Sequence, residues 1–268
     1  MNIDRRTKQL LKQYRIFPKR RLGQNLMIDE SYLQDMVSCA SLNKSDVVLD
    51  IGAGFGTLTK ILSSICHRVI AVEIDHKLAQ VLRIEMKGIE NVLLIEGDVL
   101  ETAIPTFNKV VSNPPFHVSS PILFWLLERK FDSAVMTFQK EFAKRLVASV
   151  GSKDYSRLTV ETYYRAEVEL IEVVPKDAFV PPPNVDACVV RLKPRKKSPF
   201  DVKNERVFHE LVRVLFTQRN KKTRNAMASF LLKLGRGKQE ANSVLFHDKR
   251  VRELAPEDFA EIANGLTV

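Results

Sequence analysis

The chain has 268 residues, 45% of them hydrophobic, and a formal net charge of +10. This length and apolar content suffice for one large domain, or for one domain with a small second domain. No run of about 18 apolar residues is present, and the charged N-terminus lacks an apolar segment, so we expect neither a membrane span nor a secretion signal.

Buried strands and amphipathic helices are predicted in alternation from residue 47 to about residue 149. Near-continuous apolar runs predict strands at residues 47–51, 69–73, 92–95 and 109–112, and a fifth strand that begins at Ala134. Helical spacing follows over residues 58–65, about 76–86, near 120–129 and near 141–149. This alternation is typical of a parallel sheet that helices cover on both faces.

The pattern changes after residue 150. Residues 168–174 and 187–192 resemble strands without a long helix between them, and such a pair can close a parallel sheet with an antiparallel edge. The prolines at 181–183 predict a stiff extended loop between the two strands. Residues 193–199 are basic and proline-flanked, which is typical of a linker, and helical periodicity begins at Glu205.

The predicted fold class is therefore α/β. A Rossmann-like, mostly parallel sheet with an antiparallel edge strand is expected over residues 1–197. A small, all-helical domain is expected over residues 198–268.

Positive charge is concentrated in two segments at the flanks of the predicted sheet. Residues 1–24 contain eight Lys or Arg and one Asp, and residues 193–225 contain eleven Lys or Arg and three acids. Either segment alone is explained equally well as a solvated tail. Two such segments favour a polyanionic partner, and nucleic acid in particular. We expect the N-terminal arm to be disordered until such a partner binds.

The three cysteines, Cys39, Cys66 and Cys188, are scattered and match no metal-binding or redox spacing. Buried, reduced thiols in a cytoplasmic protein are the simplest interpretation. No metal site is expected.

The loop after the first predicted strand carries glycines at Gly52, Gly54 and Gly56. Ligands of open α/β sheets bind beyond the carboxyl ends of the strands, where glycines let the backbone approach them closely. Glu73 ends the second strand, and an acid there accepts hydrogen bonds from ribose hydroxyls. Asp98 closes the third strand and is a candidate acceptor for an adenine amine.

The glycine spacing is G-x-G-x-G rather than G-x-G-x-x-G, which favours an adenosyl ligand without a pyrophosphate. S-adenosylmethionine is therefore the predicted cofactor, in preference to NAD, and the sheet is that of a class I methyltransferase. The alternative is a glycine-rich turn beside two solvated acids.

Asn113-Pro114-Pro115-Phe116 follows the fourth predicted strand and suits an aromatic amine as methyl acceptor. The lone pair of an adenine amine is delocalised into its ring. Two acceptors, the side-chain oxygen of Asn113 and the carbonyl of Pro114, would hold the two N–H groups and direct the lone pair. Phe116 would stack on the base, and Phe179 is a candidate for the opposite wall.

A paired adenine must be flipped out to reach such a pocket. The alternatives are an ordinary turn after a strand for residues 113–116 and a core aromatic for Phe179.

These residues resemble the S-adenosylmethionine-dependent dimethyladenosine transferases of small-subunit ribosomal RNA, over nearly the whole chain. The segments that carry the resemblance are 23–29, 50–54, 73–75, 97–98, 113–121, 139–145, 180–190 and 216–222. The family usually has Asn-Leu-Pro-Tyr where this chain has Asn-Pro-Pro-Phe. The latter also occurs in adenine methyltransferases that act on DNA, so the number of methyl groups added stays open.

The resemblance implies a role for each matching position. Asn25, Met27 and Gly54 would contact the cofactor, with Gly52 along its methionine part and Glu73 at the ribose. Asp98 would bind its adenine, and Asn113 would bridge cofactor and target amine. The basic helices would bind ribosomal RNA through a set of cations, which are Arg219, Lys221, Lys222 and Arg224.

The resemblance also implies the biology. Such an enzyme adds methyl groups to the exocyclic amines of two adjacent adenosines and acts on the assembling small subunit, so that it also has a role in subunit biogenesis. We expect a cytoplasmic monomer with a methyltransferase domain at 1–197 and an RNA-binding domain at 198–268. The alternatives are a large-subunit adenine methyltransferase, a non-catalytic assembly factor and a DNA adenine methyltransferase.

Overall fold

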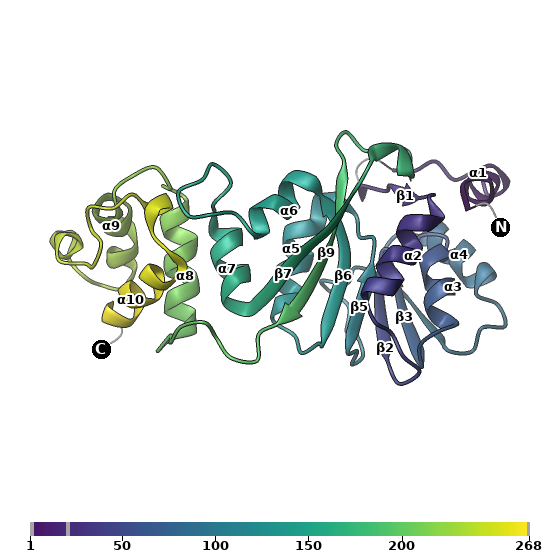
Figure 1. Ribbon diagram of the computed structural model, residues 1–268, viewed down its shortest axis with the longest axis horizontal. Coiled ribbons are helices and arrows are strands. Elements are labelled where there is room, and N and C mark those ends of the chain that lie inside the picture. Colours follow the sequence, from purple (N-terminus) through teal and green to yellow (C-terminus); the bar gives the residue numbers. More distant parts are fainter. Residues whose placement is uncertain (1–2, 20–21, 267–268) are drawn as a thin grey trace. The chain divides into compact units, whose positions relative to one another are not determined.

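The computed structural model describes residues 3–19 and 22–266. A seven-stranded sheet in the order β4-β3-β2-β5-β6-β9-β7 organises the α/β part (Figure 1). Its strands are β2 (Val47–Ile51), β3 (Arg68–Glu73), β4 (Val92–Glu96), β5 (Lys109–Ser112), β6 (Ser133–Gln139), β7 (Ala166–Val174) and β9 (Ala187–Pro194). The strands from β4 to β6 are parallel and β9 runs antiparallel to β6, which confirms the predicted Rossmann-like topology.

The helices of the α/β part are α1 (Ile3–Gln13), α2 (Glu30–Cys39), α3 (Thr57–Ser63), α4 (His76–Glu85), α5 (Ser119–Leu127) and α6 (Lys140–Leu146). Short 3-10 turns lie at η2 (Phe116–Val118) and η3 (Lys176–Ala178). Apolar residues of α2 and α3, such as Met36 and Leu62, pack with Val48 and Val111 of the sheet. This burial explains why the apolar spacing of residues 58–65 predicts a helix.

Strand order reverses between β2 and β5. β3 and β4 extend the sheet on one side of β2, and β5 and β6 extend it on the other. The loops at the carboxyl ends of β2 and β5 therefore border a crevice, the usual ligand site of an open α/β sheet.

The N-terminal arm is ordered where the structure describes it, so the expectation of disorder is wrong for residues 3–19. Leu10 of α1 is buried beside Phe55 and Leu78. Arg6 forms a bidentate ion pair with Glu85 of α4. Apolar burial and this ion pair together explain why the helix packs on the sheet domain before any partner is present. Further along, β1 (Leu26–Met27) pairs antiparallel with β8 (Phe179–Val180).

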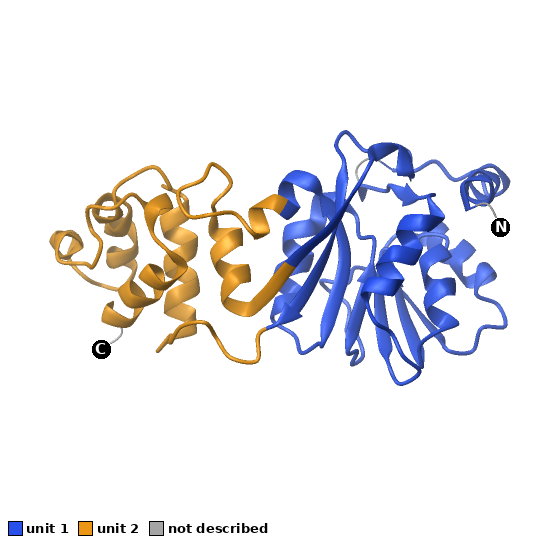
Figure 2. Cartoon of the chain, viewed as in Figure 1, with its two compact units in different colours: residues 1–143, 169–194 blue, residues 144–168, 195–268 orange. Residues whose placement is uncertain are grey.

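The chain divides into two compact units (Figure 2). Unit 1 comprises residues 1–143 and 169–194, and unit 2 comprises residues 144–168 and 195–268. The sequence pattern predicts residues 144–168 in the sheet domain, whereas the structure packs them with the helices. The reason is α7 (Arg157–Arg165), whose Val160 and Tyr164 join the apolar core of unit 2.

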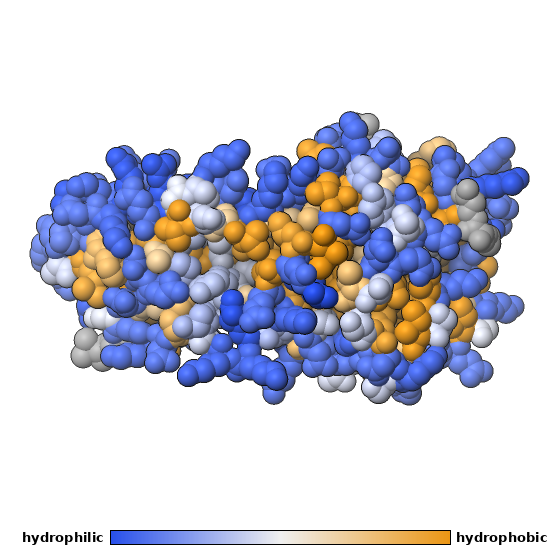
Figure 3. Space-filling view, viewed as in Figure 1, coloured by the Kyte–Doolittle hydropathy of each residue, from blue (hydrophilic) through white to orange (hydrophobic). Residues whose placement is uncertain are grey.

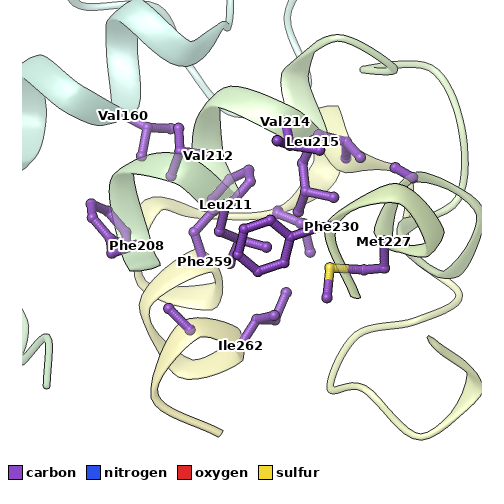
Figure 4. Packing of buried hydrophobic residues seen from close by; sticks show 14 of the residues in the cluster. Val160, Phe208, Leu211, Val212, Val214, Leu215, Met227, Phe230, Phe259 and Ile262 are labelled. Atoms are coloured by element: carbon purple, nitrogen blue, oxygen red, sulfur yellow. The ribbon is translucent and has the colours of Figure 1, made fainter. Parts of the chain in front are cut away.

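Unit 2 is built from α7, α8 (Glu205–Phe216), α9 (Thr223–Lys233) and α10 (Pro256–Leu266), with 3-10 turns η4 (Lys238–Asn242) and η5 (Val251–Glu253). Figure 4 shows the apolar side chains of α8, α9 and α10 meeting in one core, among them Phe208, Phe230 and Phe259. In the view of Figure 3, hydrophilic residues cover much of the surface of unit 2, with hydrophobic patches between them. None of the helices in the described part of the chain is long and apolar enough to cross a bilayer.

Candidate active site

A pocket lies at the carboxyl ends of β2, β3 and β5, where the strand order predicts a ligand. The predicted cofactor residues on its wall are Asn25, Met27, Gly52, Gly54, Glu73 and Asn113. The pocket is also lined by Thr7 of α1, by Asp50 and by Gln24. The N-terminal segment therefore contributes to the wall, and α1 contributes with it.

The glycine loop adopts backbone conformations that other residues rarely take. Gly52 has φ of +74° and Gly54 has φ of +60°. A Cβ atom at Gly52 would lie 2.9 Å from Cδ of Pro115, and one at Gly54 would lie 2.9 Å from Cδ2 of Leu26. Gly52 is thus required both by its left-handed φ angle and by the close approach of the Pro115 ring, whereas at Gly54 the left-handed φ angle is the main requirement, because the Leu26 side chain can shift.

Glu73 is buried and positioned by the backbone on both sides. Its Oε2 accepts a hydrogen bond from the N–H of Gly54 at 2.8 Å, and its Oε1 accepts one from the N–H of Asp75 at 2.8 Å. Burial raises the pKa of Glu73, against the effect of these hydrogen bonds. Each carboxylate oxygen retains further acceptor capacity, which is suited to ribose hydroxyls.

Asp50 is a second buried acid on the pocket wall. Its Oδ2 accepts a hydrogen bond from the hydroxyl of Thr59 at 2.7 Å. Burial raises the pKa of Asp50 to about 7, and the nearby charge of Glu73 adds to the effect. A cationic ligand in this pocket would favour the ionised form of Asp50.

Asp98 is a predicted cofactor residue that does not line this pocket. It lies in the turn after β4, where its Oδ1 accepts the N–H of Leu100 at 2.9 Å. Part of its acceptor capacity therefore stabilises the turn itself.

Asn113 is held at both ends of its amide. Its Nδ2 donates to the carbonyl of Asn25 at 3.1 Å, which ties β5 to the N-terminal segment. Its Oδ1 accepts a hydrogen bond from the hydroxyl of Thr137, a fully buried residue of β6. Sequence reasoning missed Thr137, although a hydroxyl inside the otherwise apolar run of β6 is a signal that could have identified it.

Phe116 and Phe179 lie together in one apolar cluster of the sheet domain, so in this structure Phe179 is a core aromatic, which is the alternative stated for it. Their ring centroids lie 5.9 Å apart with an interplanar angle of 73°, so the rings meet edge to face. Both are buried, and Phe179 is 1% exposed. A base cannot lie between the rings in this arrangement, so binding at both faces requires one ring to turn. Pro114 follows Asn113 in the loop after β5, two residues before Phe116.

A buried polar cluster secures the segment that precedes the pocket wall. Oδ2 of Asp75 forms an ion pair with Nζ of Lys19 at 2.7 Å and accepts a hydrogen bond from Nε2 of Gln24 at 3.0 Å. Burial alone would raise the pKa of Asp75, but the hydrogen bonds from Lys19 and Gln24 outweigh it, so the pKa is lowered. Sequence reasoning missed this cluster because Asp75 is distant in sequence from Lys19 and Gln24.

The four cations predicted to contact RNA differ in their surroundings. Arg219 donates to the carbonyl of Lys153 at 2.7 Å and to that of Ser152 at 3.0 Å, so it holds a loop of unit 2. Two others, Lys222 and Arg224, both form ion pairs with Asp248. The side chain of Lys221 is exposed.

Comparison with known proteins gives a consistent result. The family described as ribosomal RNA adenine dimethylase matches residues 17–267. A probable ribosomal RNA small subunit methyltransferase A of Methanosarcina acetivorans is 45% identical over 247 residues, which is 91% of each chain. The protein of the same description from Methanopyrus kandleri is 41% identical, over 96% of this chain and 95% of that one.

Two solved structures are similar as well. A dimethyladenosine transferase from Plasmodium falciparum has a TM-score of 0.77 and 29% identity, over 88% of this chain and 95% of that one. The 23S rRNA methyltransferase ErmE has a TM-score of 0.66 and 28% identity, over 91% of this chain and 100% of that one.

Proposed function

The chain belongs to the ribosomal RNA adenine dimethylase family, and we propose that it dimethylates two adjacent adenosines of small-subunit ribosomal RNA with S-adenosylmethionine as methyl donor. One observation supports this proposal above all. Asn113, whose amide is fixed at both ends, lies on the wall of the pocket formed by the glycine loop and Glu73.

The residues of the pocket fit the donor. Glu73 offers carboxylate oxygens for ribose hydroxyls, and Gly52 and Gly54 let a ligand approach the backbone. Asn25 and Met27 would close the wall from the N-terminal segment, and Asp98 would bind the adenine from the neighbouring turn. When bound, S-adenosylmethionine supplies an electrophilic methyl group on a sulfonium, and its transfer is an in-line displacement in which alignment contributes much of the rate.

The acceptor site would work through geometry rather than through a strong base. Oδ1 of Asn113 and the carbonyl oxygen of Pro114 would accept the two N–H groups of the adenine amine and direct its lone pair. The amine loses its proton only after it has become cationic, so no strong base is required. Phe116 would stack on the base, and Phe179 would support it or form the opposite wall after one ring has turned.

The small ribosomal subunit is the proposed partner because the relatives with 41–45% identity are described as small-subunit enzymes. Unit 1 supplies most of the proposed methyltransferase domain (1–197). Unit 2 supplies most of the proposed RNA-binding domain (198–268). Among the proposed RNA contacts, Lys221 presents an exposed charge, whereas Arg219, Lys222 and Arg224 would have to keep or exchange their present partners. We further propose a cytoplasmic monomer with a role in subunit biogenesis.

The decisive experiment is transfer of labelled methyl groups to immature small subunits, large subunits, naked ribosomal RNA and DNA. Label is expected in immature small subunits, at two adjacent adenosines, and mass spectrometry of the nucleosides then gives the number of methyl groups on each. Label only in DNA or large subunits would overturn the proposal.

A large-subunit substrate is the second candidate, because ErmE is a 23S rRNA methyltransferase of similar structure. The same experiment separates the two, since the large-subunit reading predicts label in large-subunit RNA and none in small subunits.

A further inference from the structure

Phe17 is the most exposed large hydrophobic side chain in the described part of the chain, at 83% exposure. It follows α1, on the segment that leads to the pocket wall. The exposed ring leaves an aromatic face open to stacking by a partner.

The exposure of Phe17 is imposed by anchors on both sides. Ile16, directly before it, is buried beside Leu10, Phe55 and other apolar residues. Lys19, two residues later, is tied to Asp75 through Nζ and to Gln24 through its backbone N–H. With its neighbours fixed in this way, the segment presents the ring outward.

Cations surround the exposed ring. Phe17 lines a shallow hollow that also involves Lys8, Leu11, Lys12, Arg15, Ile16 and Pro18. Lys8 is paired with Asp4, but Lys12 and Arg15 are exposed and form no ion pair among the described residues. The hollow thus combines one aromatic face with uncompensated positive charge, which is the combination that binds single-stranded nucleic acid.

A membrane surface fits this hollow less well. The apolar stripe of α1 is not available to a membrane, because Leu10 packs inward on the sheet domain. Only one large apolar side chain remains exposed there, with cations beside it. The charge favours a polyanion, and the flat ring favours a base.

We infer that Phe17, Lys12 and Arg15 form a secondary contact for the RNA substrate, in which Phe17 stacks on one unpaired base and the two cations bind its flanking phosphates. This inference rests on the proposed function. From Phe17 to Leu22 on the pocket wall the chain spans at most about 18 Å. The bound base would therefore lie a few nucleotides from the target adenosine on the same strand, and would help to hold that strand unpaired.

The test uses the full chain, a single-stranded oligoadenylate RNA and immature small subunits. Phe17→Ala is expected to raise Kd for the oligonucleotide and KM for the subunit about tenfold, with kcat and S-adenosylmethionine affinity unchanged. Phe17→Trp should retain binding and show fluorescence quenching when RNA is added. Ile84→Ala is the matched control, because Ile84 is also an exposed apolar residue of unit 1, at 54% exposure.

The charge contribution is tested separately. The double variant Lys12→Gln/Arg15→Gln should reduce the magnitude of the salt slope of oligonucleotide binding by about 1.4, since each phosphate contact contributes about 0.7 for a single strand. An unchanged salt slope would show that Lys12 and Arg15 do not bind RNA phosphates.

Three outcomes would overturn the inference. The first is that Phe17→Ala binds RNA as tightly as the wild type does. The second is a parallel loss of S-adenosylmethionine affinity, which would indicate a packing role, and the third is weaker binding to subunits but not to protein-free RNA, which would indicate a ribosomal protein as partner. Failure of the proposed function is distinguishable, because the wild type would then transfer no methyl group to small-subunit RNA, whatever the effect of Phe17→Ala.

Discussion

The hydroxyl of Thr137 donates a hydrogen bond to Oδ1 of Asn113, from β6 to the end of the adjacent parallel strand β5. Together with the bond from Nδ2 to Asn25, it allows only one orientation of the amide. Oδ1 retains a second lone pair, so the same bond that fixes the oxygen leaves it able to accept an amine N–H. Thr137 is therefore a positioning residue for the proposed acceptor site.

Thr137→Val removes the donor at nearly constant volume. We expect kcat for methyl transfer to fall by about 10- to 100-fold, because small misplacements of an acceptor group have effects of this size. The Kd for S-adenosylmethionine should change less than about twofold, and Thr137→Ser should restore most of the rate. Single-turnover methylation and calorimetric binding measure the two effects. Equal loss of rate in the Ser and Val variants would refute the positioning role.

Asn113→Ala is expected to lower the rate of methyl transfer by about 10²- to 10³-fold, the range found when a preorganised hydrogen-bonding group is removed from an active site. S-adenosylmethionine binding should weaken much less. If Thr137 acts through Asn113, then Thr137→Val has little further effect in the Asn113→Ala background. Independent, multiplicative losses in the double variant would mean that Thr137 acts by another route.

Gly52→Ala and Gly88→Ala separate backbone strain from close approach. Both glycines have positive φ, +74° and +85°, so both substitutions impose a similar conformational cost of about 1 kcal/mol. Only the Cβ at Gly52 would clash, with Pro115, whereas nothing lies within 4 Å of one at Gly88. We expect Gly52→Ala to lose S-adenosylmethionine binding and Gly88→Ala to keep it. Thermal unfolding with and without ligand provides both measurements, and equal ligand stabilisation of the two variants would contradict the expectation.

The pKa of Asp50, raised by burial to about 7, predicts a pH dependence of cofactor binding. A cationic sulfonium favours the ionised carboxylate, so affinity for S-adenosylmethionine should rise as the pH increases through about 7 and level off above it. S-adenosylhomocysteine lacks the sulfonium charge and should show a weaker dependence. Asp50→Asn should flatten the difference between the two ligands. Titration calorimetry across this pH range gives the comparison, and parallel profiles for both ligands would count against Asp50.

The same pKa has the opposite consequence for the unliganded fold. Between the ordinary aspartate pKa of 3.8 and about 7, Asp50 is protonated when folded and ionised when unfolded. Its contribution therefore makes the free energy of unfolding fall as the pH rises through that window.

Arg219 and Lys221 are predicted to differ although both belong to the basic segment. Arg219→Gln should lower the free energy of unfolding by about 1–3 kcal/mol, since two charge-assisted hydrogen bonds to the 152–153 loop are lost. Lys221→Gln should leave stability unchanged and reduce the magnitude of the salt slope of RNA binding by about 0.7–0.9. Denaturant titration and salt-dependent binding make the comparison. If Arg219→Gln is as stable as the wild type and reduces the salt slope of RNA binding, then Arg219 contacts RNA.

Local patterns predicted much of the α/β fold. Apolar runs identified the strands from Val47 to Met136, because a strand of a parallel sheet is buried on both faces. The helices α1, α2 and α7 are absent from the prediction. In α2 the buried residues Leu33, Met36 and Val37 have helical spacing, but the polar residues around them weaken the signal.

Candidate ligand residues were predictable for a related reason. Gly52, Glu73 and Asn113 each follow or end a strand, and the topology of a parallel sheet brings such positions to one edge. Their lining of a common pocket agrees with that expectation. Asp98 occupies a comparable place in the sequence but lies outside this pocket.

The sequence by itself determined the alternation of elements, the glycine loop and the position of Asn-Pro-Pro-Phe after a strand, because each depends on residues that are neighbours along the chain. Only the tertiary structure decided that α1 packs on the sheet domain, that residues 144–168 join the helical unit and that Thr137 contacts Asn113. These features depend on burial and hydrogen-bond partners that are distant in sequence. Periodicity can predict that a side chain is buried, but only the packed structure identifies its partner.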